Sequence, residues 1–563
     1  MQKKLLEKIR KHRGPFTKEL VEGWHKKDLD DVVPYLESCF RSIFNSLIEK
    51  GFHFEGLEEV CPKEFYELIT KPNGSGIKNF EISKNSFFGV AMKSYYLDPN
   101  DRNAKPEPLK TPLMFLPFTN KHGDIFVRNS LYSLQYVLSE RGPSVDGTNN
   151  KTIFIRVLGY KFKVMVELHR YYKVSFDKRT GSITRYPQAV KFPATRFFNS
   201  RNDRKIRDNK TPLPLLAWYT FGKYGFDYAM REFAECEYRI GFEDELVRDC
   251  PASEGWEIFV NGAEVHPKHI GPVDLSIKEP GIAIKQREQH EVGTLAFQYA
   301  GALLYMFGVF TSRLDLSRLN DTEYWRLLIG HCSIKLPMGS PDEAYLRQIP
   351  EHFVSVEGYA DAHTLDRYNK TGIPVKNFYE LLNYLIVNYS NIIRTYNPAD
   401  LLHKEIASKE FLLENIIHSA NEFKFRIRNK SNITAKIINR ELDLHFKLFG
   451  IDRSIRENNT ILEQTGTDNP FIDYGLGIIR QTKSTISRGP GGKKDEFDPN
   501  HPGSQIDASQ PFVVSYQYAT GPSPEGNGLM QPRVYLVSGK YTGIREEDRE
   551  LYERTKRRLR GIK

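Results

Sequence analysis

The chain has 563 residues, a formal net charge of +10 and a hydrophobic fraction of 39%. This length allows roughly three domains with buried cores, and the basic balance favours an anionic partner. The five cysteines are widely separated and form no Cys-x-x-Cys pair, which argues against a zinc site or a disulfide framework and for a reducing compartment.

The first 95 residues or so are predicted to be helical. Residues 1–13 are charged throughout, so we expect an amphipathic helix there and no secretory signal. Further along, apolar residues recur at helical spacing: Val33, Leu36, Phe40, Ile43, Phe44 and Leu47.

Residues 110–194 are predicted to form short strands separated by turns. The clearest strands are 152–158 and 160–168, the second with strict alternation of apolar and polar residues. A basic stretch follows at 196–210, which is typical of a solvated loop, with contact to a DNA backbone as the alternative.

The rest of the chain up to residue 449 is predicted to be mainly helical. The apolar run at 294–310 is short for a membrane span and contains Gln298, Gly301 and Gly308, so we expect a buried core helix. Apolar spacing also predicts a long amphipathic helix at 375–396 and a second helical block at 401–449.

The segment from Asn469 to Met530 carries two glycine-proline motifs, Gly489-Pro-Gly-Gly492 and Ser523-Pro-Glu-Gly526. Glycines let a backbone pass close to a ligand, and proline limits how far a loop can collapse. Basic residues suited to phosphate contacts flank the first motif, namely Arg480, Lys483, Arg488, Lys493 and Lys494. A solvated hinge is the alternative, and a Walker phosphate loop is excluded by Ser487 and Lys494.

In this order the segment resembles the fork region of the second-largest (β) subunit of multisubunit RNA polymerases. Weaker resemblances to the same subunit follow in family order at 111–129, 134–144, 191–195, 214–226 and 433–436. Around Pro524 the motif is two residues shorter than is usual in the family.

The resemblance implies a multidomain α+β fold with mixed helices and small β-sheets. We expect a protrusion-like domain in two parts, residues 1–145 and 397–468, with a lobe-like insertion at 146–396. A fork-like region would occupy 469–563 and end in a helix near 545–560, where acids precede bases as the helix dipole favours.

The resemblance also implies site residues. Nucleic acid would contact Arg141, Arg480, Lys483, Arg488, Gly489, Pro490, Gly491, Gly492, Lys493 and Lys494. The active centre would be lined by Pro524, Glu525, Gly526 and Asn527. No catalytic residue and no metal ligand is expected in this chain, since the family holds Mg2+ on its largest subunit. The acidic trio Asp495, Glu496 and Asp498 lies beside two lysines, and His266 and His269 lack ligand partners nearby in sequence.

The chain is short for a cellular β subunit, which continues into a region that carries two active-site lysines. No residue of this chain matches those lysines. We therefore expect the N-terminal part of a divided β subunit, as in the RNA polymerases of giant (jumbo) bacteriophages, with the non-virion type favoured. Expected partners are a C-terminal β fragment, divided β′ chains, a promoter-specificity subunit, DNA, RNA and nucleoside triphosphates, with no membrane. The enzyme would act in the cytoplasm of the infected host, or be carried in the virion. A non-catalytic DNA-binding, structural or promoter-specificity protein remains the alternative.

Overall fold

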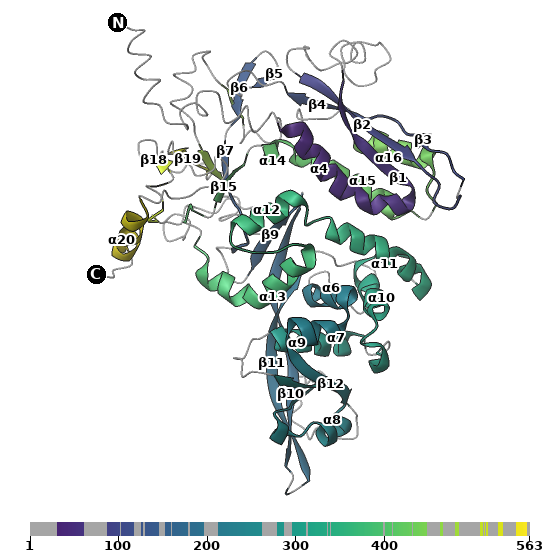
Figure 1. The fold of residues 1–563 in the computed structure, drawn as a ribbon, viewed down its shortest axis with the longest axis vertical. Coiled ribbons are helices and arrows are strands. Elements are labelled where there is room, and N and C mark those ends of the chain that lie inside the picture. The colour runs from purple at the N-terminus through teal and green to yellow at the C-terminus, as the bar shows by residue number, and fades with distance from the viewer. Residues whose placement is uncertain are drawn as a thin grey trace.

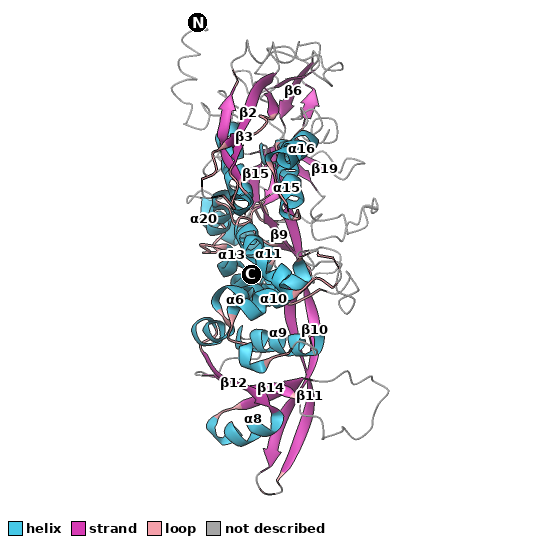
Figure 2. Ribbon diagram, turned by 90° about the vertical axis from the view of Figure 1, so that its right-hand side faces the viewer, coloured by secondary structure: helices cyan, strands magenta, loops and turns pink. Residues whose placement is uncertain are grey.

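The computed structural model describes residues 31–60, 87–117, 125–145, 152–195, 212–261, 279–286, 295–310, 314–446, 462–464, 479–482, 507–515, 527–532 and 548–559, with breaks of one or two residues inside some ranges. They form a multidomain α+β fold, as the sequence predicts, with helices and small sheets arranged along one long axis (Figure 1; Figure 2). Within these ranges no helix is both long and apolar enough to cross a bilayer.

One unit joins residues from both sides of the long central part of the chain. Its elements are α4 (Val32–Phe44), η1 (Asn45–Lys50), β1 (Phe52–Glu59), β2 (Phe87–Tyr96), β3 (Glu107–Pro108), β4 (Leu113–Pro117), α14 (Lys409–Leu412), α15 (Glu414–Arg428) and α16 (Ala435–His445). The prediction of helix up to residue 95 is correct for α4 and wrong for β1 and β2. These two strands pair over seven positions, and their aromatic and β-branched residues suit a pleated, half-buried surface.

Aromatic rings from distant segments fill the core of this unit. The ring of Phe423 lies 5.8 Å from that of Phe44 and 5.2 Å from that of Phe52, both edge-on. Edge-to-face pairs of this kind stabilise a core beyond the area they bury. Residues after 409 therefore pack against residues before 60 in one apolar cluster.

A second unit is built on a seven-stranded antiparallel sheet in the order β12-β14-β13-β10-β9-β8, with β11 on β10. The strands are β8 (Ser144–Val145), β9 (Ile153–Val157), β10 (Tyr160–Asp177), β11 (Ser182–Thr195), β12 (Cys236–Phe242), β13 (Glu257–Asn261) and β14 (Pro280–Gln286). Two of them, β9 and β10, confirm the strands predicted at 152–158 and 160–168.

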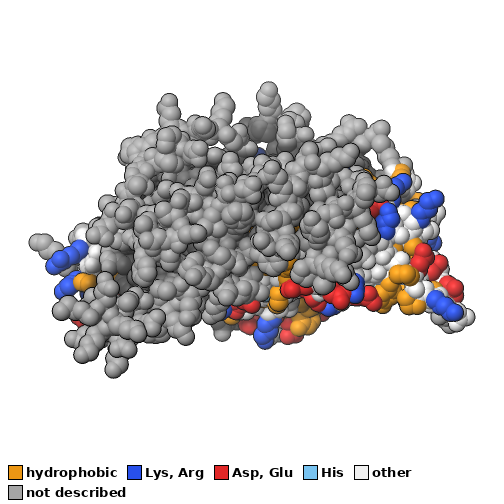
Figure 3. Space-filling model, turned by 90° about the horizontal axis from the view of Figure 1, so that it is seen from above, with side chains coloured by type: hydrophobic (Ala, Val, Ile, Leu, Met, Phe, Trp, Pro, Cys, Tyr) orange, Lys and Arg blue, Asp and Glu red, His pale blue; other side chains and the backbone are white. Residues whose placement is uncertain are grey.

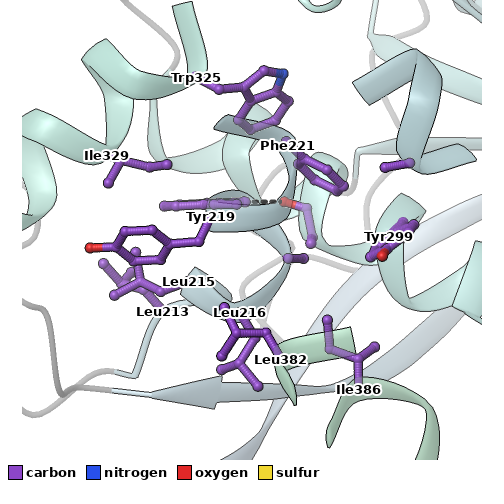
Figure 4. Close-up of a cluster of buried hydrophobic side chains, with 14 of the residues drawn as sticks. Leu213, Leu215, Leu216, Tyr219, Phe221, Tyr299, Trp325, Ile329, Leu382 and Ile386 are labelled. Carbon is purple, nitrogen blue, oxygen red and sulfur yellow. Dashed lines mark hydrogen bonds between the residues drawn. The ribbon is translucent and has the colours of Figure 1, made fainter. Parts of the chain in front are cut away.

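Helices on one side of this sheet form the largest apolar core. They are α6 (Leu215–Tyr224), α7 (Phe226–Tyr228), α9 (Leu295–Val309), α10 (Thr322–Ser333), α11 (Asp342–Glu357), α12 (Ala362–Lys370) and α13 (Phe378–Thr395). Ten of its side chains are labelled in Figure 4: Leu213, Leu215, Leu216, Tyr219, Phe221, Tyr299, Trp325, Ile329, Leu382 and Ile386. The predictions of a buried helix at 294–310 and an amphipathic helix at 375–396 are confirmed by α9 and α13.

Two details explain how closely these elements approach. Trp218 on α6 donates its indole N–H to the carbonyl of Ala302 on α9, at 3.0 Å, so the buried ring leaves no polar atom unsatisfied. A Cβ on Gly301 would lie 2.6 Å from Val190 on β11, and this glycine therefore lets α9 lie directly against the sheet.

The hairpin of β10 and β11 pairs over fourteen positions and extends past α8 (Glu243–Asp249) at the far end of the molecule (Figure 2). In the described part of the sheet β11 pairs with β10, and its other side is an edge apart from a bridge between Thr195 and Leu213. Pro187 and Pro193 both lie on this edge strand.

Candidate nucleic-acid interface

Three segments singled out from the sequence meet in one five-stranded sheet in the order β15-β7-β17-β19-β18. The strands are β15 (Lys404–Ala407), β7 (Tyr136–Glu140), β17 (Ile479–Thr482), β19 (Asn527–Pro532) and β18 (Val514–Ser515). The pairing of β7 with β17 is parallel and sets Val137 opposite Arg480. The strand that precedes Arg141, the strand that carries Arg480 and the strand that begins at Asn527 are thus neighbours.

The register of β17 and β19 ties the two glycine-proline motifs together. Thr482, the last residue of β17, is the antiparallel partner of Asn527, the first residue of β19. Residues 483–526, which contain both motifs, are therefore flanked by one residue pair of the sheet, and β18 of the same sheet lies between the two motifs in sequence. The remaining predicted site residues lie outside the described residues: Lys483, Arg488, Gly489, Pro490, Gly491, Gly492, Lys493, Lys494, Pro524, Glu525 and Gly526.

Arg141 directly follows β7 and is 8% exposed. Its guanidinium donates to the carbonyl of Leu402 at 2.7 Å. In this position Arg141 joins the end of β7 to the chain before β15. Contact of Arg141 with nucleic acid stays a prediction.

The sheet is fixed to the second unit by a buried polar contact. Lys404 and Glu140 are opposite each other on β15 and β7 and form an ion pair. Tyr396, just after α13, donates its hydroxyl to the same Glu140 carboxylate at 3.1 Å. Burial, and then the Glu140 charge, raises the pKa of Tyr396, so this hydroxyl stays protonated as a donor. The strand β15 also corrects the prediction of a continuous helical block at 401–449, because pairing with β7 requires an extended chain.

A layer of buried charge, here called the polar seam, lies between the two apolar cores. It consists of Glu351, His352, Asp361, Arg367, Glu405, Glu410, Lys424 and Arg428. A cavity of about 180 Å³ opens within it, lined by side chains of both units, including Tyr35 and Glu410 from the first and Asp361 and Arg367 from the second. This polar space is large enough for several water molecules, since each occupies about 30 Å³ in the liquid.

One ion pair of the polar seam crosses from α12 to β15. Arg367 Nε lies 3.0 Å from Glu405 Oε1, and Arg156 Nη1 lies 3.8 Å from the same oxygen. Burial alone lowers the pKa of Arg367, but the Glu405 and Glu410 carboxylates outweigh it and raise that pKa. A buried pair of this kind contributes little net stability, yet removal of one partner is costly.

The other half of the polar seam holds two cations of α15, four residues apart. Lys424 Nζ lies 4.7 Å from the centre of the Tyr359 ring. Burial, and then the adjacent Arg428 charge, lowers the pKa of Lys424 to about 7. The nearby carboxylate of Glu351 is already paired with Lys50 at 3.1 Å.

Arg428 fixes the tautomer of His352 on α11. Arg428 Nη1 lies 3.2 Å from His352 Nδ1, and a guanidinium can only donate, so Nδ1 accepts and Nε2 carries the proton. His352 Nε2 faces the Tyr219 hydroxyl, which donates to Ser333 Oγ at 3.3 Å. Burial, and then the Arg428 and Lys424 charges, holds the pKa of His352 well below its usual value.

Buried charged side chains among the described residues form ion pairs and cation–π contacts. No group of three or more His, Cys, Asp or Glu among them is placed to hold a metal ion. The cysteines within the described ranges, Cys39, Cys236, Cys250 and Cys332, are buried, while Cys61, His266 and His269 lie outside those ranges. The described residues thus offer buried ion pairs and a positioned sheet.

Sequence reasoning missed the polar seam. Lys424 and Arg428 continue a helical stripe with Ile417 and Asn421, all four of them buried. The sequence did place Lys424 and Arg428 on the same helical stripe as Ile417, which could have indicated buried charge. Two charged residues at this spacing more often lie on a solvated helix face, however.

Comparison with known proteins bears on the part of the chain that holds both cores. A family model described as "Non-virion RNA polymerase subunit" matches residues 2–447. The match ends before β16 (Leu462–Gln464), β17 and β19, so the basic segment lies beyond it. No curated protein matches the chain.

Proposed function

The chain belongs to the non-virion RNA polymerase subunit family, and on that premise we propose that it corresponds to the N-terminal part of the β subunit of a DNA-directed RNA polymerase. It would form one jaw of the DNA channel and hold the fork at the downstream edge of the bubble. The protrusion-like, lobe-like and fork-like divisions at residues 145, 396 and 468 are part of this proposal. Residues 111–530 support it through their resemblance, in order, to that subunit.

The pairing of Thr482 with Asn527 is the observation that carries the proposal. It sets Thr482 and Asn527, which flank residues 483–526, opposite each other on one sheet. A glycine-rich loop anchored in this way can press its backbone against nucleic acid, and the lysines and arginines beside it can bind phosphates. The loop would then act where the template strands part.

Catalysis requires the assembled enzyme. This chain would position the template and the RNA end, while Mg2+ on a partner chain would stabilise charge at the α-phosphate of the incoming nucleotide. Its partners would be a C-terminal β fragment, β′ chains and a promoter-specificity subunit. The complex would act in the cytoplasm of the infected host. We expect no RNA synthesis from this chain alone.

A crosslink tests the shared pair of residues. Thr482→Cys with Asn527→Cys should form a disulfide under mild oxidation, because antiparallel partners have Cα atoms within about 4.5–5.5 Å. Thr482→Cys with Met530→Cys is the matched control, since Met530 pairs with Ile479 at the other end of β17. Equal crosslinking of the two pairs would contradict the register.

A second experiment tests the loop in the assembled polymerase. Gly491→Val with Gly492→Val should impair transcription from duplex DNA more than from a pre-melted template. Thermal stability of the purified variant checks folding. Equal loss on both templates, with normal stability, would refute a strand-separating role. Promoter-specific DNA binding by the single chain, with active polymerase assembling without it, would favour a promoter-specificity factor instead.

A further inference from the structure

The C-terminal helix α20 (Arg549–Leu559) packs on the protein through Tyr552. Tyr552 is buried there, and its ring meets that of Phe512 edge-on at 5.8 Å between centroids. Ala508 and Leu402 complete this small apolar cluster. The ring of Tyr552 therefore fixes which face of the helix packs on this cluster.

The opposite face carries three exposed arginines: Arg554, Arg557 and Arg558. At 3.6 residues per turn they lie about 140–240° around the helix from Tyr552. We call this the arginine face. Its position follows from the anchor, because burial of Tyr552 turns these three side chains to solvent.

The arginine face has no ion-pair partner among the described residues. Glu550 and Glu553 stand four residues before Arg554 and Arg557, which is the spacing of a helical ion pair, yet neither pair forms. At the same spacing elsewhere, the exposed Arg231 is paired with Asp227 at 2.7 Å. Unpaired charge at this density suits an anionic partner.

The helix is also connected to the candidate nucleic-acid interface. Phe512, which anchors it, lies two residues before β18, and β18 pairs with β19. Figure 1 shows α20 near β18, and Figure 3 shows Lys and Arg side chains at the left margin of the molecule seen from above. The helix that carries the arginine face is thus held two residues from β18, the edge strand of the sheet that carries Arg480.

We propose that the arginine face of α20 binds the phosphate backbone of a nucleic acid strand next to this sheet. Guanidinium groups bind phosphate oxygens in pairs of parallel hydrogen bonds, and such contacts position a strand without reading its sequence. The proposal rests on the proposed function only in requiring nucleic acid near the sheet. Duplex and single strands offer the same phosphates, and the experiment distinguishes them.

The test uses the full chain and three variants. In the first, Arg554, Arg557 and Arg558 become Gln, and in the second they become Lys. The matched control changes three exposed, ion-paired arginines to Gln: Arg231, Arg239 and Arg318. Binding to a labelled duplex and to a labelled single strand is measured by fluorescence anisotropy over a range of salt concentrations.

Each phosphate contact contributes about 0.9 to the slope of log K against log salt on duplex DNA and about 0.7 on single strands. The Gln variant should lower that slope by about 2–3 on the strand type it contacts. The Lys variant should keep most of the slope, and the control should change it little.

Several results would overturn the proposal. These are an unchanged slope on both strand types, an equal loss in the control, or a loss in the Lys variant as large as in the Gln variant. Unchanged nucleic-acid binding with loss of partner subunits on purification would assign the arginine face to an acidic protein surface. The loop experiment fails or succeeds separately, because the Gly491 and Gly492 variants leave α20 intact.

Discussion

Replacement of Lys424 by methionine should make the protein more stable at neutral pH. The wild-type ammonium is buried beside Arg428, with the Tyr359 and Phe425 rings as its nearest partners. The polar seam also holds the neutral His352 and the Glu351 carboxylate, which is paired with Lys50. Methionine keeps most of the volume and removes the charge.

The size of the effect follows from the pKa. Lys424 falls from 10.5 to about 7 on folding, so between these values the unfolded chain binds a proton that the folded chain does not. Stability then rises with pH across this window, by about 1.4 kcal/mol per pH unit at most. Below about pH 7 the full penalty is present, about 5 kcal/mol, and near pH 10.5 it vanishes.

The gain in the variant is smaller than this penalty, because methionine loses the cation–π contact, worth about 0.5–2 kcal/mol. We expect Lys424→Met to be about 2–3 kcal/mol more stable than wild type at pH 7 and about equal to it near pH 9.5. Urea unfolding at pH 6.5, 8 and 9.5 measures this difference. Lys436→Met on the exposed side of α16 is the control. A gain that is the same at all three pH values would refute the burial of a neutral lysine.

Three further predictions concern the same units. Glu405→Gln leaves Arg367 and Arg156 without their shared carboxylate, and should lower the free energy of unfolding in urea by about 3–5 kcal/mol. Glu414→Gln at the exposed rim of the cavity is the control, and should change the free energy of unfolding by less than about 1 kcal/mol. Gly301→Ala should lower the melting temperature, because the new Cβ would lie 2.6 Å from Val190. Gly308→Ala on the same helix should be neutral or slightly stabilising, because its Cβ meets nothing closer than 3.7 Å. The opposite order of melting temperatures would contradict the close packing of α9. Wild-type stability should fall as pH drops below about 6.5, because His352 binds a proton in the unfolded chain but stays neutral when buried in the folded protein. His352→Gln should therefore flatten that part of the profile of stability against pH.

The periodicity of apolar residues correctly predicted the helices and strands that bury one face. The strict alternation at 160–168 and the apolar stripe of α13 each bury one face, so period alone identifies them. The strands β1 and β2 were missed because their pairing joins segments on either side of residues 61–86. The strand β15 was missed because its partner β7 is far away in the sequence.

The polar seam and the pairing at Thr482 could not be read from the sequence for a related reason. A buried Lys424 differs from a surface lysine only through side chains such as Tyr359 and His352, which belong to another unit. The order of the two glycine-proline motifs was visible in the sequence. Their attachment at Thr482 and Asn527 depends on register, which a single strand does not specify.

The prolines of β11 have a consequence for an enzyme assembled from several chains. An edge strand that shows free N–H and C=O groups can recruit a strand from any neighbour, which leads to aggregation during assembly. Pro187 and Pro193 each remove an N–H from this strand, so a foreign strand cannot form a continuous ladder along it. The long hairpin can therefore project into a crowded complex and still meet its neighbours through side chains, where charge and shape decide which surfaces bind.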